Sequence, residues 1–198
     1  MRRYSLSNVS IAIAALMAAS IFVWTGVHAL YFAPDISYAP PNAPVVAASS
    51  SDPVRLIIPS LHINAAVQYV GVKADGSMGT PNNFTDVAWY KYGTTPGQLG
   101  SAVIDGHVDN GLGLDGVFKH LQDIQVGADI FVQEKDGQQL HFKVIDIETY
   151  PYKNVPLQTV FAQTDAARLN LVTCEGVWVP NGKTYDHRLV VYTELQSS

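Results

Sequence analysis

Three residues in the second half of the chain have side chains that can act together on an acyl group: Cys174, His107 and Arg188. Cys174 ends an apolar, β-rich run and is the single cysteine of the 198 residues. His107 follows another apolar run within a Gly-His-Val-Asp sequence, and Arg188 begins the last β-rich run. A thiolate attacks carbonyl carbon, an imidazole can protonate a leaving amine, and a guanidinium can hold an oxyanion. These residue types at strand edges predict a site for thiol acyl transfer.

Each of the three residues also has a purely structural explanation. A lone cysteine in a strand is often a small buried residue, and Arg188 could form a surface ion pair. His107 and Asp109 could begin a metal site, although the sequence offers no third ligand that matches them. Glu175 follows the cysteine directly, and a carboxylate there would oppose thiolate formation unless it points away. The alternative to an enzyme is therefore a β-rich binding module.

Composition restricts the function further. The formal net charge is −5. Two of the positive charges belong to the arginines nearest the N-terminus, so the rest of the chain is more acidic still. Nucleic-acid binding requires a basic surface, so the charge argues against that class of partner. A single cysteine also excludes an intramolecular disulfide and a metal site built from several cysteines. Neither exclusion bears against a peptide substrate.

The N-terminus has the pattern of a membrane anchor followed by a spacer. Residues 9–32 contain no Asp, Glu, Lys or Arg, and about 20 apolar residues are enough to span a bilayer as a helix. The arginines within residues 1–8 indicate a cytoplasmic N-terminus. A cleaved signal peptide is the alternative, but its apolar core is shorter, about 7–15 residues. Residues 33–53 are rich in Pro, Ala and Ser and predict a semi-extended spacer.

Residues 54–198 predict one mainly β domain on the extracellular side of the cell membrane. Asp-Gly at 136–137 is the strongest hairpin signal in the chain. Outside the N-terminal segment no long helical pattern occurs, so we expect only short helices there. About eight short strands favour a closed barrel or a sandwich. The clearest strands are expected at residues 54–58, 65–72, 101–104, 129–135, 140–148, 168–174 and 187–195.

The order and surroundings of the three candidate residues resemble the sortases. The resemblance lies in Leu-Val-Thr-Cys at 171–174, in Gly-His-Val-Asp at 106–109 and in Arg188 at the head of the final strand. It extends over residues 54–195, including the order of their apolar and turn segments. The resemblance implies a closed eight-stranded sortase-type β-barrel with short helices.

The resemblance also implies a role for each residue. Cys174 would be the nucleophile, His107 the general acid and base, and Arg188 the group that stabilises the oxyanion or the substrate. Thr173 and Val172 are expected to contact the substrate. The connection at 149–167 would bind the sorting signal, and the segment at 175–186 would be a mobile loop near the entry of the amine.

Sortases are cysteine transpeptidases of bacterial surfaces. The resemblance implies that the chain cleaves a Leu-Pro-x-Thr-Gly-like signal between Thr and Gly and transfers the acyl group to an amine. The expected partners are secreted proteins that carry a C-terminal sorting signal and an amine of peptidoglycan or another envelope component. A pilin lysine is the alternative amine. No cofactor is expected, with calcium dependence left open, and the compact domain without a lid resembles class F.

Overall fold

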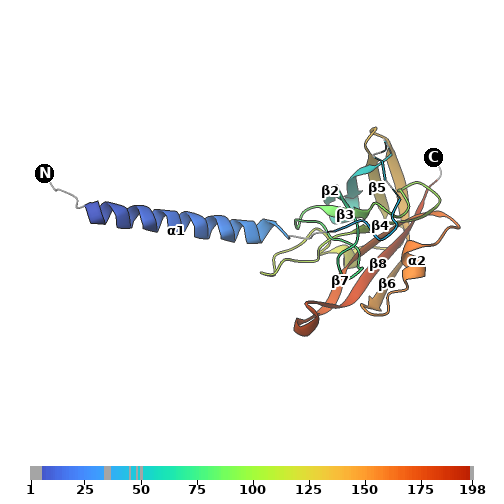
Figure 1. Cartoon of the computed structure of the whole chain (residues 1–198). Helices are drawn as coiled ribbons and strands as arrows, with labels where there is room; N and C mark the ends of the chain where they lie inside the picture. The colour runs from blue at the N-terminus through green and yellow to red at the C-terminus, as the bar shows by residue number, and fades with distance from the viewer. Residues whose placement is uncertain (1–5, 34–36, 45, 48, 50, 197–198) are drawn as a thin grey trace.

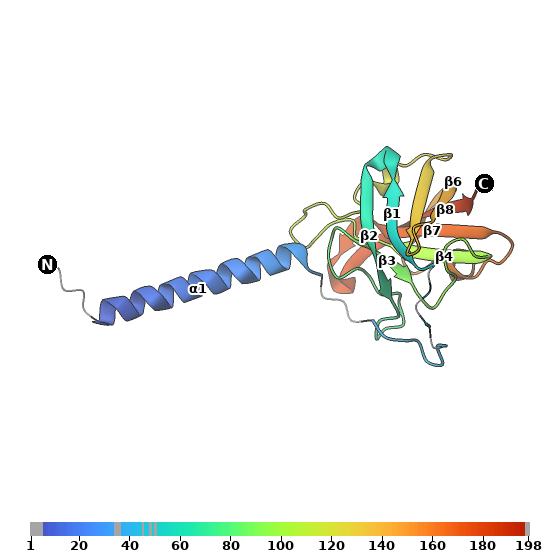
Figure 2. The ribbon, with the colours of Figure 1, turned by 90° about the horizontal axis from the view of Figure 1, so that it is seen from above.

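The computed structural model describes residues 6–33, 37–44, 46–47, 49 and 51–196. A long helix, α1 (Leu6–Tyr31), extends away from the β-rich domain (Figures 1 and 2). It covers most of the segment in which the sequence predicts a membrane anchor. No helix among the described residues combines the length and apolarity that a membrane span requires. The anchor therefore stays a prediction from the sequence.

Within the described residues, eight strands form one closed barrel, which confirms the predicted barrel (Figure 1). Their order around the barrel is β1-β2-β3-β4-β7-β8-β6-β5. Strands β2 and β3 pair in parallel, as do β4 and β7, and the other neighbours are antiparallel. The strands are β1 (Pro53–Ile58), β2 (Ile63–Val70), β3 (Val87–Tyr90), β4 (Gly100–Asp105), β5 (Asp129–Glu134), β6 (Gln139–Pro151), β7 (Ala167–Val179) and β8 (Thr184–Leu195). The helices of the domain are short: η1 (Pro59–Leu61), η2 (Leu121–Asp123), α2 (Leu157–Phe161) and η3 (Pro180–Gly182).

Side chains alternate between the barrel interior and its outer surface. In β5, Ile130 and Val132 are fully buried while their neighbours are partly exposed, as expected for a strand with one face in the core. Strand β4 is buried along almost its whole length, because its inner face meets the core and its outer face is covered by α2. The outer face carries a second apolar cluster of Val103, Val160, Val190 and Tyr192.

The hairpin predicted at Asp136 and Gly137 is confirmed. The β5–β6 ladder reaches the pair Gln133 and Gln139 on either side of this turn. Gly137 has a φ of 91°, a left-handed conformation that a residue without a β-carbon adopts readily. The local turn chemistry thus sets the register of these two strands.

The two C-terminal strands extend further than the sequence predicts. Strand β7 continues past Cys174, and β8 begins before Arg188, so most of the predicted loop at 175–186 is a paired hairpin arm. Cys174 therefore lies within a strand and not at its end. Gly176, two residues further along β7, marks a bulge.

The bulge interrupts the β7–β8 pairing between Glu175 and Trp178. Gly176 has a φ of 88° there. A β-carbon on Gly176 would lie 2.1 Å from Oδ1 of Asp186, so the close approach requires glycine. Such a bulge sharpens the local twist and redirects the end of the hairpin.

The first described residues after α1 run along the surface of the domain. Phe32 forms a β-bridge with Asn83, and Tyr38 forms one with Val72. Both partners belong to the connection between β2 and β3. Within the predicted spacer at 33–53, Tyr38 is therefore attached to the barrel domain.

Candidate active site

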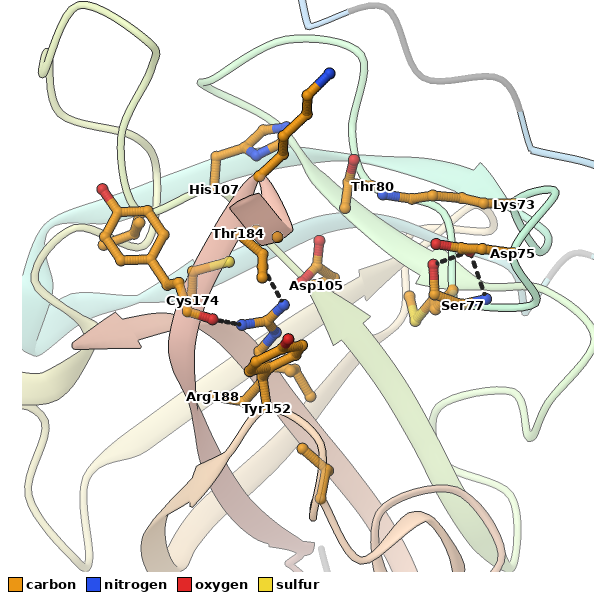
Figure 3. A pocket seen from close by; sticks show the side chains of 18 of the residues that line it. Lys73, Asp75, Ser77, Thr80, Asp105, His107, Tyr152, Cys174, Thr184 and Arg188 are labelled. Carbon is orange, nitrogen blue, oxygen red and sulfur yellow. Dashed lines mark hydrogen bonds between the residues drawn. The ribbon is translucent and has the colours of Figure 1, made fainter. Parts of the chain in front are cut away.

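The outer faces of β4, β7 and β8 border a pocket of about 1390 Å³ that all three candidate residues line (Figure 3). Antiparallel pairing sets Cys174 of β7 directly opposite Arg188 of β8. Residues paired in this way share a face of the sheet, with β-carbons roughly 4.5–5.5 Å apart. His107 comes from the segment after β4, and in Figure 3 Cys174 lies between His107 and Arg188. The fold thus brings the three predicted residues to one pocket.

The surroundings of Cys174 keep its thiol protonated. Burial raises the pKa of Cys174 above the ordinary thiol value. The charge of Arg188 lowers this pKa, the Asp105 carboxylate raises it, and Lys73 lowers it. At neutral pH the thiol is therefore the main form, and the thiolate that attacks carbonyls is a minor species. Arg188 is the strongest of the influences that favour the thiolate.

Glu175, the neighbour of the thiol, does not line the described pocket. Successive residues of a strand point to opposite faces, and Glu175 is paired with His187 instead. The carboxylate that raises the pKa of Cys174 is that of Asp105, at the end of β4. The sequence did not indicate Asp105, because only the parallel pairing of β4 with β7 brings it near the thiol.

The ring of His107 is held by the connection between β2 and β3. Its Nε2 lies 2.9 Å from the carbonyl oxygen of Pro81, and its ring packs on Phe84 with centroids 5.0 Å apart. A carbonyl oxygen can only accept, so Nε2 carries the hydrogen of this bond. In the neutral ring Nδ1 is then the nitrogen without a hydrogen, and it takes up the proton when the ring becomes charged.

Thr173 lies inside the barrel, unlike its two neighbours in β7. It is 1 % exposed, and its hydroxyl donates a hydrogen bond of 2.7 Å to the carbonyl of Gly106. The predicted contact of Thr173 with substrate does not fit this placement, because the side chain faces away from the pocket. Val172 does line the pocket. Thr173 instead ties β7 to the residue that precedes His107.

The guanidinium of Arg188 is fixed in position by several contacts. Nη1 donates to the carbonyls of Tyr185 and His187 at 3.0 and 2.8 Å, and Nη2 donates to Thr184 Oγ1 at 2.7 Å. Its Cζ lies 5.8 Å from the centre of the Tyr152 ring. A guanidinium has about five N–H donors in a planar fork, so further donors remain for a substrate oxygen.

A hydrogen bond joins the histidine segment to β8. The Tyr185 hydroxyl donates to Oδ2 of Asp109, and burial together with this bond raises the pKa of Tyr185 to about 12. Trp178 packs against the same tyrosine, with ring centroids 5.5 Å apart. Sequence reasoning did not identify Tyr185, because no local pattern shows that the two segments meet.

The sequence also allows His107 and Asp109 to begin a metal site. In the part of the chain that the structure describes, no three His, Cys, Asp or Glu side chains are grouped so that they could hold a metal ion. The described residues thus offer His107 and Asp109 no third ligand. Calcium dependence, which the sequence leaves open, is a separate question.

Comparisons with known proteins agree with this architecture. A family model described as the sortase domain matches residues 56–196. Sortase A from Corynebacterium diphtheriae, as a lid mutant, is 17% identical with a TM-score of 0.57, over 74% of this chain and 72% of that chain. Sortase C-1 from Actinomyces oris is 23% identical with a TM-score of 0.53, over 74% and 76%. A sortase D5 transpeptidase from Clostridium perfringens is 17% identical with a TM-score of 0.54, over 76% and 83%. No curated protein matches the chain.

The solved structures show the fold but do not assign a subclass, because proteins named as sortases A, C and D match with similar TM-scores. The likeness to class F stays a prediction. The family model spans most of the chain and includes Cys174, His107 and Arg188. With the closed barrel and the pocket on β4, β7 and β8, this match shows that the chain belongs to the sortase family.

Proposed function

We propose that this sortase cleaves a Leu-Pro-x-Thr-Gly-like sorting signal between Thr and Gly and transfers the acyl part to an amine of the cell envelope. The observation that carries the proposal is the meeting of Cys174, His107 and Arg188 at one pocket. Membership of a family of cysteine transpeptidases supports the reaction type. The role of each residue follows from its chemistry and its contacts.

The lining of the pocket supports an extended peptide as substrate. Its apolar residues include Val172 and Phe161, which pack against the outer apolar cluster. The three candidate residues line the same pocket. A peptide whose Leu-Pro part packs on these apolar residues would present its Thr carbonyl to Cys174. The connection at 149–167, which includes α2, supplies some of the apolar lining, in keeping with its expected role.

In the acylation step, Sγ of Cys174 attacks the Thr carbonyl carbon and a C–S bond forms. Because the pKa of Cys174 is raised, the thiol proton has to leave during the attack, and Nδ1 of His107 is its acceptor. The carbonyl oxygen becomes an oxyanion, which the free N–H donors of Arg188 stabilise. The C–N bond then breaks, and the protonated His107 gives its proton to the leaving glycine amine. A thioester on Cys174 remains.

The transfer step reverses these roles. An incoming amine attacks the thioester carbonyl, and Nδ1 of His107 accepts a proton from the amine nitrogen. Arg188 again stabilises the oxyanion. When the C–S bond breaks, the proton returns to the sulfur, and Cys174 is restored as a thiol. Overall, one amide bond is broken and another is formed, so the exchange needs no oxidant or cofactor.

The proposed location is the outer face of the cell membrane. The support is the uncharged run at residues 9–32 and the large apolar side chains that α1 exposes, including Leu16, Phe22 and Trp24. The partners would be secreted proteins with a C-terminal sorting signal. Protease treatment of intact cells should digest the domain while residues 1–8 stay protected. Recovery of the full chain in the soluble fraction would contradict the proposal.

The function is tested with the full chain in detergent micelles, a library of Leu-Pro-x-Thr-Gly-like peptides and an added peptide amine. Mass spectrometry should detect the transfer product and an acyl adduct on Cys174. The Cys174→Ala variant should give neither. If no peptide is cleaved, or if Cys174→Ala cleaves as well as the parent, the proposed function is wrong. Thermal unfolding of both proteins checks that the comparison concerns folded chains.

One observation favours a second function, a non-catalytic peptide-binding module. Burial and Asp105 raise the pKa of Cys174, which disfavours the reactive thiolate. The two functions differ in their use of His107. A binding module would keep its peptide affinity in His107→Ala, and a peptide with an electrophilic end would not label Cys174 faster than a free electrophile does. Selective labelling that His107→Ala abolishes would exclude the second function.

A further inference from the structure

The connection between β2 and β3 supplies both a wall of the pocket and a contact to the proposed acid–base group. Several of its residues line the pocket, among them Lys73, Asp75 and Thr80 (Figure 3). Further along the same connection, the Pro81 carbonyl accepts the hydrogen bond from His107 Nε2 at 2.9 Å. The position of this irregular segment therefore affects the orientation of the His107 ring.

The peptide group between Pro81 and Asn82 is held from the barrel side. Its carbonyl accepts from His107, and its N–H donates to Gln68 Oε1 of β2 at 3.0 Å. Gln68 Nε2 in turn donates to Asn82 Oδ1 and to Asp86 Oδ2 at 2.9 and 2.8 Å. Hydrogen bonds in such a chain polarise and reinforce one another.

The N-terminal segment holds the next peptide group from the other side. Ala33, just after α1, donates its N–H to the Asn82 carbonyl at 2.7 Å, and Phe32 forms a bridge with Asn83. The junction between helix and barrel is therefore one peptide unit away from the carbonyl that orients His107. In the described residues this is where the chain after α1 first contacts the barrel.

A second set of contacts fixes the start of the same connection. Tyr38 and Val72 exchange two backbone hydrogen bonds of 2.6 and 2.8 Å, and the Gly71 N–H donates to Ser37 Oγ at 3.0 Å. A β-carbon on Gly71 would lie 1.9 Å from the Tyr38 carbonyl oxygen, so the two backbones are in close contact. Residues 32–33 and 37–38 are thus attached near the two ends of the connection.

We propose that residues 32–33 and 37–38 form a positioning strap for the active site: they hold the connection between β2 and β3 so that the Pro81 carbonyl orients His107. Ala33 and Tyr38 act through the backbone of Asn82 and Val72 and do not touch the substrate. The proposal rests on the proposed role of His107 in proton transfer. It implies that the segment joining the helix to the barrel is part of the working enzyme, so the barrel alone is an impaired catalyst.

The test compares Ala33→Pro with Ala33→Ser in the full chain. Proline lacks the N–H that bonds to the Asn82 carbonyl, whereas serine keeps it. We expect Ala33→Pro to lower kcat for a cleaved peptide by about 3- to 10-fold, the effect of one hydrogen bond, with little change in KM. Ala33→Ser should stay close to the parent. Tyr38→Pro and Tyr38→Ala form a second pair, because Tyr38 is 56% exposed and only proline removes the N–H that donates to the Val72 carbonyl.

A measurement that does not depend on turnover separates this proposal from the proposed function. Nitrogen NMR of histidine-labelled protein, with the His107 signals identified by His107→Gln, reports which ring nitrogen carries the hydrogen. The parent and Ala33→Ser should show the Nε2–H form of His107, and Ala33→Pro should show a mixture of both forms. If His107 gives the same signals in all three proteins, the strap does not position it and the proposal is overturned. This result can be read even if no peptide is cleaved.

Discussion

Cys174 and Arg188 are positioned by a regular ladder, whereas His107 is positioned by irregular backbone. The first two are direct partners in the antiparallel pairing of β7 with β8, which continues for several residues on the side toward Leu169. His107 depends on the Pro81 carbonyl, the Phe84 ring and the segments that hold them. Ladder positions tolerate local change because neighbouring pairs maintain the register, but a loop contact has no such support. The position of His107 should therefore be more sensitive to substitutions in its surroundings than the positions of Cys174 and Arg188.

Among variants that keep the Cys174 thiol, the largest effect is expected from removal of the His107 imidazole. His107→Ala should lower kcat/KM by about 10²- to 10⁴-fold, the usual contribution of a positioned acid–base group. The control is His141→Ala, since His141 bonds to Asp129 and stacks on Phe131 away from the pocket. Peptide turnover and thermal unfolding measure the two effects. Equal losses for both variants would show that His107 has no catalytic role.

The next largest effect is expected at Arg188, which the β7–β8 ladder positions. Arg188→Lys keeps a positive charge but loses the planar fork that can donate to an oxyanion while bonding to the hairpin. We expect kcat to fall by about 10²-fold, within the range for loss of one oxyanion donor. Arg168→Lys is the matched control, because Arg168 is on the same ladder but pairs with Asp165 outside the pocket. A kcat that is unchanged in Arg188→Lys would show that charge alone is sufficient.

Much of the barrel follows from local sequence signals. The Asp136-Gly137 turn and the alternating strands each have a pattern that the chain shows directly. The β7–β8 arm was missed because Gly176 resembles a strand end, although here it allows a bulge against Asp186. Whether a glycine ends a strand or bulges within it depends on the partner strand, which the local sequence does not reveal.

The three central site residues could be found from their types and order, but their surroundings could not. Asp105 reaches Cys174 through the parallel register of β4 and β7, and Tyr185 reaches Asp109 across the pocket. These contacts join segments far apart in the sequence, and no spacing rule connects them. Thr173 illustrates the opposite error, a contact expected from sequence proximity that the fold does not allow. It is next to the nucleophile in sequence, but side chains alternate along the strand, so Thr173 points to the barrel interior.

The buried hydroxyl of Thr173 links the two sides of the site, so its removal should affect both stability and turnover. Thr173→Val leaves the buried Gly106 carbonyl without this donor, which should cost about 1–3 kcal/mol of unfolding free energy. Thr193→Val is a close control, because Thr193 is fully buried and its hydroxyl donates to Leu169 at the same distance of 2.7 Å. Denaturant unfolding should show similar losses of stability.

Turnover should separate these two threonine variants. At a temperature where both are folded, Thr173→Val should lower kcat severalfold, because Gly106 precedes His107, whereas Thr193→Val should keep the parent value. Equal kcat values for the two variants would show that the Thr173–Gly106 bond is only a stabilising contact. A difference would support the view that His107 depends on its supporting contacts.

The smallest effect concerns the ionisation of the thiol. Asp105 raises the pKa of Cys174 and Lys73 lowers it, so Asp105→Asn should move the pH profile of Cys174 alkylation to lower pH and Lys73→Met should move it to higher pH. Below the pKa, the alkylation rate is proportional to the thiolate fraction. At pH 7.5 the rate should therefore rise severalfold in Asp105→Asn and fall in Lys73→Met. Iodoacetamide labelling of full chains, followed by mass spectrometry, measures this rate.

Asp146→Asn, which changes a carboxylate outside the pocket, is the control. Shifts of the same sign in both pocket variants would mean that a change in access to the thiol, and not its electrostatic surroundings, sets the rate. Opposite shifts would show that the wall of the pocket adjusts the reactivity of a nucleophile whose position the ladder already determines.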